Sequence, residues 1–97
     1  MITYDFQDGN GAVAAHQHAH GGGWVADTAR VDEKVYVEAG AVVYGNAEIF
    51  DDCEIFAGST VSGTAVLRGW CVLLGATVTG TALIEDTMLG AKDTISA

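Results

Sequence analysis

A strict step of six residues most limits how this chain can fold. Aliphatic side chains occupy nine successive positions six residues apart: Val25, Val31, Val37, Val43, Ile49, Ile55, Val61, Leu67 and Leu73. A small or slim residue lies two positions before each of the last eight: Ala29, Val35, Ala41, Ala47, Cys53, Ser59, Ala65 and Cys71. Residues two apart on a strand share a face, so both sets are expected to point inward. Six residues rotate a helix by about 600°, which scatters such a set, so the pattern predicts a short strand and a corner, repeated.

After Leu73 the step becomes irregular. We expect Val78, Ile84, Leu89 and Ile95 to be the next inward residues, at steps of five, six, five and six. The alternative register runs through Val66, Val72 and Val78, and it would force Trp70 into a position reserved for small side chains. Glycine, which tolerates the positive φ of tight corners, recurs where corners are expected, at Gly45, Gly63, Gly69 and Gly75.

The segment WVADTARV and the units YGNAEIF and SGTAVLR resemble the hexapeptide-repeat family, which forms left-handed parallel β-helices. The resemblance covers residues 24–97. The opening, YDFQDGNGAVAAHQH, is similar to the start of small hexapeptide-repeat proteins of bacteriophage and prophage genomes.

The resemblance implies an all-β fold in which three hexads close one triangular coil of about eighteen residues. About four coils would follow, with paired parallel strands about 4.8 Å apart. Three inner columns result: Val25, Val43, Val61, Val78 and Ile95; Val31, Ile49, Leu67 and Ile84; Val37, Ile55, Leu73 and Leu89. Residues 1–23 would form an N-terminal capping segment with a His-rich loop. This segment, which carries Ile2, Tyr4 and Phe6, would cover the open end of the first coil and its unpaired strand groups.

Charge and cysteine content limit the partners and the compartment. Four Lys and Arg residues stand against 13 Asp and Glu, a formal net charge of −9. This balance argues against a nucleic-acid or anionic-membrane ligand, and it favours either solubility alone or a basic protein partner. No export signal and no apolar membrane-spanning run are visible, so we expect reduced thiols and a cytoplasmic location, in a bacterial host if the chain is phage-derived.

Most characterised proteins of the family are acyltransferases that use a histidine in the coils as general base, with a protruding loop at the acceptor site. Residues 24–97 contain no histidine and no long insertion, so we name no catalytic residue and no cofactor, and we lean away from an enzyme. The leading hypothesis is a non-catalytic structural or protein-interaction module of phage derivation. One alternative is a reduced acyltransferase-like protein with an intersubunit acyl-coenzyme A site. A second is an acidic inhibitor of a nucleic-acid-binding protein.

The histidines are clustered as His16, His18 and His20. In an extended chain they share one face, about 6.6 Å between neighbours, which makes a transition-metal site one hypothesis. His16 and His20 would be about 13 Å apart, so other copies of the chain would have to complete the site. The competing interpretation is a solvated, glycine-flanked loop.

Two further clusters have both a structural and a functional interpretation. Cys53 and Cys71 should stack as buried thiols that fill space in the core. The acidic residues Glu48, Asp51, Asp52 and Glu54 form either a face for a basic protein, a weak divalent-cation site, or a solvated corner.

Large apolar side chains also fall at outward positions beside the second and third inner columns. They are Phe50, Phe56, Val66, Val72, Leu74, Leu83 and Met88, with Trp70 at the corner between the two faces. A monomer rarely leaves such a contiguous surface in water. We therefore expect a homo-oligomer, and the resemblance implies a homotrimer.

Overall fold

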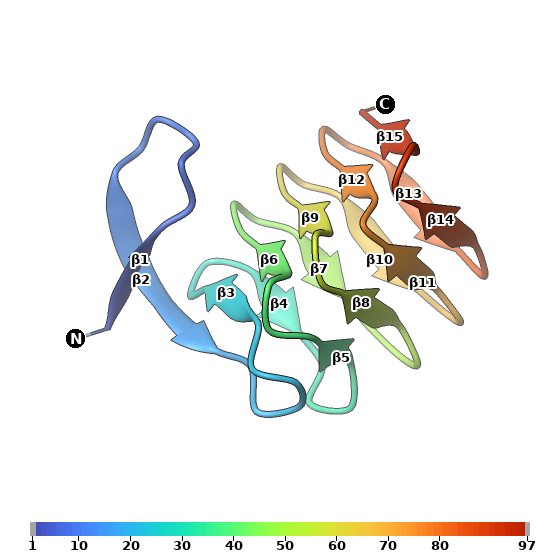
Figure 1. Cartoon of the computed structure of the whole chain (residues 1–97), viewed down its shortest axis with the longest axis horizontal. Coiled ribbons are helices and arrows are strands. Elements are labelled where there is room, and N and C mark those ends of the chain that lie inside the picture. The colour runs from blue at the N-terminus through green and yellow to red at the C-terminus, as the bar shows by residue number, and fades with distance from the viewer. Residues whose placement is uncertain (1, 97) are drawn as a thin grey trace.

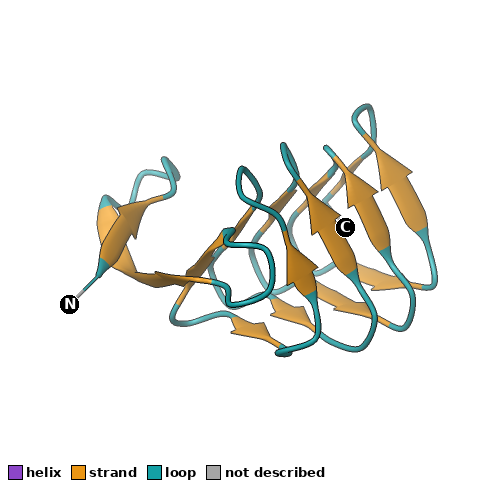
Figure 2. Cartoon of the chain, turned by 60° about the horizontal axis from the view of Figure 1, so that its bottom comes forward, coloured by secondary structure: helices purple, strands orange, loops and turns teal. Residues whose placement is uncertain are grey.

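The computed structural model describes residues 2–96, which form strands and no helix (Figures 1 and 2). Met1 and Ala97, the end residues of the two predicted segments, lie outside the described residues. Three sheets run along the molecule. Sheet 1 contains the hairpin β1 (Thr3–Asp5) and β2 (Ala12–Gln17), followed by β3 (Trp24–Ala26), β6 (Val42–Val43), β9 (Thr60–Val61), β12 (Thr77–Val78) and β15 (Thr94–Ile95).

Sheet 2 contains β4 (Arg30–Val31), β7 (Glu48–Ile49), β10 (Val66–Arg68) and β13 (Leu83–Glu85). Sheet 3 contains β5 (Tyr36–Val37), β8 (Glu54–Phe56), β11 (Val72–Leu74) and β14 (Met88–Gly90). The chain visits sheets 1, 2 and 3 in turn, and each strand from β3 to β12 pairs in parallel with the strand one coil later. The fold is therefore a parallel β-helix of about four coils, as predicted.

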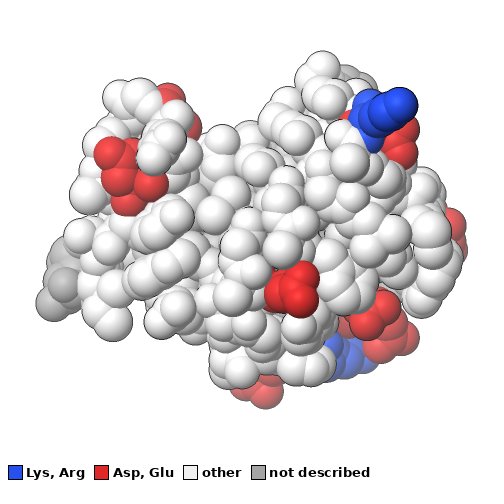
Figure 3. Space-filling model, viewed as in Figure 1, with Lys and Arg blue, Asp and Glu red and all other residues white. Residues whose placement is uncertain are grey.

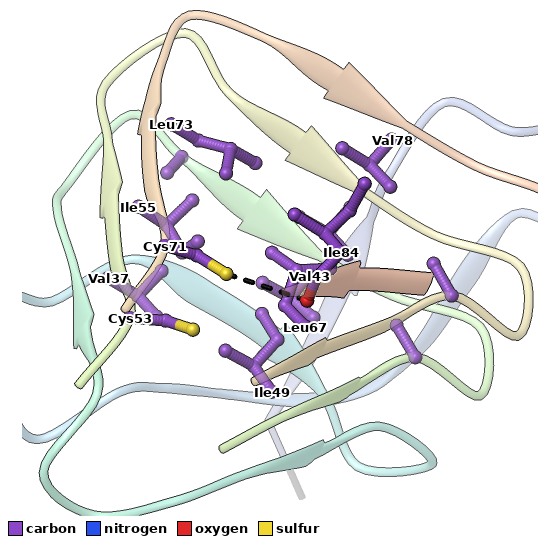
Figure 4. Packing of buried hydrophobic residues seen from close by; sticks show 14 of the residues in the cluster. Val37, Val43, Ile49, Cys53, Ile55, Leu67, Cys71, Leu73, Val78 and Ile84 are labelled. Atoms are coloured by element: carbon purple, nitrogen blue, oxygen red, sulfur yellow. Dashed lines mark hydrogen bonds between the residues drawn. The ribbon is translucent and has the colours of Figure 1, made fainter. Parts of the chain in front are cut away.

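The strand registers confirm all three inner columns. Val25 pairs with Val43, Val43 with Val61, Val61 with Val78, and Val78 with Ile95. The other two columns follow the predicted order through Leu67 and Leu73. Most of these side chains are fully buried and form one stack of aliphatic rings (Figure 4). The irregular steps after Leu73 are confirmed as well, and Trp70 lies at an exposed corner.

Shortened corners produce these irregular steps. The coil that joins Val61 to Val78 has one residue fewer than the coil that joins Val43 to Val61. Ser59 lies beside the shortened corner, at a position where the coils before and after it have Ala41 and Ala76. Its buried hydroxyl donates to the Leu73 carbonyl at 3.1 Å and accepts the Gly75 N–H at 2.8 Å. One serine therefore satisfies backbone groups on both sides of Leu74, where the coil is short.

Replacing Ser59 with alanine should lower the free energy of unfolding by about 1–3 kcal/mol, because the buried Gly75 N–H loses its acceptor. Urea titration followed by circular dichroism measures the loss. Ser96→Ala, which changes an exposed serine, is the control and should leave the midpoint unchanged. Equal midpoints for the two variants would show that the Ser59 bonds do not stabilise the corner.

The N-terminal hairpin continues sheet 1 beyond the first coil. Strand β2 pairs antiparallel with β3 and extends sheet 1. Tyr4 and Phe6 then pack on the outer face of that sheet, where Tyr4 stacks on Trp24 at 4.7 Å and Phe6 on Tyr44 at 4.9 Å between ring centroids. Ile2 is 62% exposed. The hairpin thus covers the free edge of β3 at the open end of the first coil, while Tyr4 and Phe6 pack on the outer face of sheet 1.

The loop between β2 and β3 protects the free edge of β5. The Val37 N–H donates to the His20 carbonyl at 3.0 Å, and the Gly23 N–H donates to the Val37 carbonyl at 2.8 Å. Gly21 has φ +116°, and a Cβ there would overlap the Val37 carbonyl oxygen. This glycine is required for the loop to lie against β5, where it takes the place of a preceding coil.

Candidate functional site

The outer surfaces of sheets 2 and 3 carry the predicted interface residues. Trp70, Leu74, Leu83 and Met88 are 49%, 47%, 53% and 55% exposed, an unusual state for side chains of this size. Phe50, Phe56 and Val66 are half-buried. We call these seven residues the apolar face.

Val72 differs from the other predicted interface residues. Its side chain points outward on β11, between Glu54 and Met88 in the register of sheet 3. It is nevertheless only 6% exposed, because its neighbours within the chain already cover it. Val72 therefore packs against neighbouring side chains of its own chain. Little of its surface remains to be buried against another molecule.

Sheet 3 is the less charged part of this surface. Its strands lie side by side in Figure 1, and Figure 3, drawn from the same side, shows a largely uncharged surface with a few acidic groups and with basic ones toward its margins. Phe56 pairs with Leu74 on neighbouring strands, and Phe56 also contacts Tyr36 at 5.6 Å between ring centroids. Apolar contacts thus continue along sheet 3 from the first coil to the third.

Sheet 2 mixes apolar and charged residues. Val66 and Leu83 pair in register, and the next outward pair is Arg68 and Glu85. The Arg68 Nε donates to Glu85 Oε2 at 2.8 Å, with both side chains about half exposed. An exposed ion pair of this kind contributes little to stability. The Arg68–Glu85 pair occupies one side of sheet 2, so the apolar part of this sheet is the side that carries Val66 and Leu83.

The acidic cluster divides into bonded and exposed members. Asp51 adopts φ +65° at the corner between sheets 2 and 3, and its Oδ2 accepts the Gly69 N–H at 3.0 Å. The Asp51 N–H points to Asp32 Oδ2 at 3.3 Å, and the Trp70 N–H donates to Asp86 Oδ1 at 2.8 Å. Aspartates therefore link the corners of successive coils, which gives Asp51 a structural role.

The remaining acidic residues are arranged differently. Glu48 is half-buried on β7, where it pairs with Arg30 and Val66. Asp52 and Glu54 are exposed and remain available to a basic partner. Sequence reasoning missed Asp32 and Asp86, because each accepts a hydrogen bond from a backbone N–H of a neighbouring coil, the following one for Asp32 and the preceding one for Asp86. The available signal was position: Asp86 aligns with Asp51 and Gly69 in the corner column, and Asp32 lies one residue before that column.

The three predicted metal ligands each face a different oxygen of the chain. His16 Nδ1 lies 2.7 Å from Asp27 Oδ1, just after β3 in sheet 1. His18 is buried, with its Nε2 2.7 Å from the Val35 carbonyl oxygen. His20 is exposed, with its Nδ1 3.3 Å from the Lys34 carbonyl oxygen. Each imidazole thus has a protein partner of its own.

Among residues 2–96, no group of three or more His, Cys, Asp or Glu side chains is arranged to hold a metal ion. The hypothesis of a metal site completed by other copies stays a prediction. No pocket is detected on the same residues.

Cys53 and Cys71 are stacked, buried free thiols, in agreement with their interpretation as core residues (Figure 4). The Cys71 Sγ lies 3.5 Å from the Ile84 carbonyl oxygen and 3.2 Å from that of Arg68. Burial raises the pKa of the Cys53 thiol, and the neighbouring Cys71 thiol raises it further. A thiol held neutral is a poor nucleophile.

Comparison of the chain with family models, with curated proteins and with solved structures gives no match. Within the described part of the chain, no helix is long and apolar enough to cross a membrane.

Proposed function

We propose that this chain is a non-catalytic structural or protein-interaction module that acts as a homo-oligomer, with a homotrimer as the leading arrangement. The observation that carries the proposal is the exposure of Trp70, Leu74, Leu83 and Met88 on adjoining surfaces of sheets 2 and 3. Burying a large apolar side chain completely stabilises the buried state by about 1.5–3 kcal/mol. About half of the surface of each of these four side chains is still exposed and can be buried on association.

A second copy of the chain is the simplest cover for this face. The strands of sheet 3 are in register from β5 to β14, so the outer surface is regular along the coils. Such a surface suits a copy related by rotation about an axis parallel to the stack of coils. In a closed, rotationally symmetric oligomer the apolar face of every copy is covered, and the assembly cannot grow into a filament.

A protein partner of this oligomer would be basic. The chain has a formal net charge of −9, and Asp52 and Glu54 remain exposed beside the apolar face. A field of this sign steers cationic partners and repels nucleic acid. We propose that the module acts in the bacterial cytoplasm and has a phage origin, as the resemblance of its opening residues implies.

Replacing Leu74 with aspartate should dissociate the oligomer while the inner columns stay intact. A charge buried at the interface adds a desolvation cost to the lost apolar contact. Sedimentation equilibrium at micromolar concentration should give about 30 kDa for a trimer of the 10.0 kDa chain and about 10 kDa for the variant.

Thr94→Asp is the matched control, because Thr94 is an exposed outward residue on sheet 1, away from the apolar face. It should retain the mass of the unchanged protein. A mass of about 10 kDa for the unchanged protein would refute the oligomer. Strong thermal stabilisation by acyl-coenzyme A would instead favour the acyltransferase-like alternative.

A further inference from the structure

The three histidines share one feature of their hydrogen bonding. In each, one ring nitrogen faces an oxygen that can only accept: the Asp27 carboxylate for His16, and backbone carbonyls for His18 and His20. That ring nitrogen therefore carries the proton, and in a neutral imidazole the other nitrogen keeps its lone pair. Histidines that bind metal ions nearly always have their second nitrogen fixed by a carboxylate or a carbonyl in this way.

His20 has the best position for binding an external ion. It is exposed, whereas His18 is buried. Its ring meets the Tyr36 ring edge-on at 5.2 Å, and Tyr36 contacts Phe56. His20 therefore lies at the N-terminal end of the outer surface of sheet 3, continuous with the apolar face. The Lys34 carbonyl fixes its Nδ1, so its Nε2 is the free nitrogen.

We propose that His20 is a transition-metal ligand at the interface between copies, where Nε2 atoms of His20 from two or more chains bind one ion. The inference rests on the proposed oligomer, since residues 2–96 of one chain provide no three-ligand group. Rotation about an axis parallel to the stack of coils keeps equivalent residues at the same level. Because His20 adjoins the apolar face through Tyr36 and Phe56, copies of this histidine can meet at the edge of the proposed interface. Imidazole nitrogen suits Zn²⁺, Ni²⁺ and Cu²⁺.

The local charge favours a cation at this place. Glu54 is exposed on the neighbouring strand, in register with Tyr36. The net charge of −9 adds a general attraction for cations. Ions bound by imidazoles of several copies would hold together the N-terminal ends of the coils.

The test uses untagged protein purified without immobilised metal. Its mass is first measured in chelator, and Zn²⁺ binding is then measured by isothermal titration calorimetry. We expect one ion per oligomer and an oligomer that withstands greater dilution when Zn²⁺ is present. His20→Asn is the decisive variant, because the asparagine amide can still donate to the Lys34 carbonyl while the Nε2 ligand is removed. It should weaken Zn²⁺ binding more than tenfold.

His16→Asn is the matched control, since His16 also uses Nδ1 but lies on sheet 1. It should bind Zn²⁺ as the unchanged protein does, and the Leu74→Asp variant should lose the ion. Unchanged binding in His20→Asn, or equal binding by the Leu74→Asp variant, would overturn the metal site. If the protein is an oligomer in chelator and then binds no Zn²⁺, the metal site is refuted and the proposed oligomer is not. A protein that is monomeric both with and without Zn²⁺ overturns this inference and the proposed function together.

Discussion

Replacing Leu67 with alanine should lower the free energy of unfolding by about 2–5 kcal/mol. Leu67 is fully buried in the second inner column, between Ile49 and Ile84 on the neighbouring coils. Each coil contributes one large side chain to each column, so no second layer can collapse into the space left by the leucine. A small domain has only about 5–15 kcal/mol of stability in total, so this single change removes a large part of it.

Urea titration followed by circular dichroism measures the loss, at one fixed protein concentration because an oligomer would make stability depend on concentration. Ile2→Ala is the control: it also replaces a large aliphatic residue with alanine, but Ile2 is 62% exposed and lies outside the coils. Its unfolding midpoint should match that of the unchanged protein. If Leu67→Ala cost no more than Ile2→Ala, the inner columns would not be the main source of stability.

The coils could be predicted from the sequence because a β-helix repeats one local rule. Every coil must bury one large side chain per sheet at a fixed distance along the chain, so large aliphatic residues recur periodically in the sequence. After Leu73 the six-residue spacing becomes irregular. Trp70 distinguishes the two possible registers there, because an indole does not fit a position of small residues. Leu67 is fully buried in the structure and its neighbour Val66 points outward, as that choice of register requires.

The N-terminal hairpin and the corner bonds could not be predicted in the same way. Both depend on hydrogen bonds between single groups that are distant in the sequence, and such bonds have no period. Tyr4 and Phe6 alternate as in any strand, which gives no information on which edge of the helix the hairpin extends. Asp86 bonds to the Trp70 N–H only because that corner lies one coil away.

The candidate site was predictable in part for the same reason. Outward positions follow directly from inward ones, so Leu74 and Met88 could be placed on sheet 3 before the structure was known. How far each side chain is exposed depends on its neighbours on adjacent coils. That is why Val72, covered by its own chain, could not be told apart from Leu74 by position alone.

Replacing Gly63 with alanine should be far more damaging than the same change at Gly11. Both glycines have φ +70°, so the backbone strain of an added side chain is the same, about 1–2 kcal/mol. At Gly11 a new Cβ would meet nothing within 4 Å. At Gly63 it would lie 2.7 Å from the Gly80 carbonyl oxygen and 2.8 Å from the Gly80 nitrogen, both of them backbone atoms of the next coil.

The difference between the two variants isolates the contact between stacked corners. Relief of the overlap requires the corners to separate, which strains the bond from the Thr64 N–H to the Gly80 carbonyl at 2.8 Å. We expect Gly63→Ala to lower the free energy of unfolding by several kcal/mol, roughly 2 or more beyond Gly11→Ala, in paired urea titrations. An equal loss of unfolding free energy in both variants would mean that the stacked corners separate at no cost in free energy. In that case the close stacking of Gly45, Gly63 and Gly80 would not be what holds this corner column together.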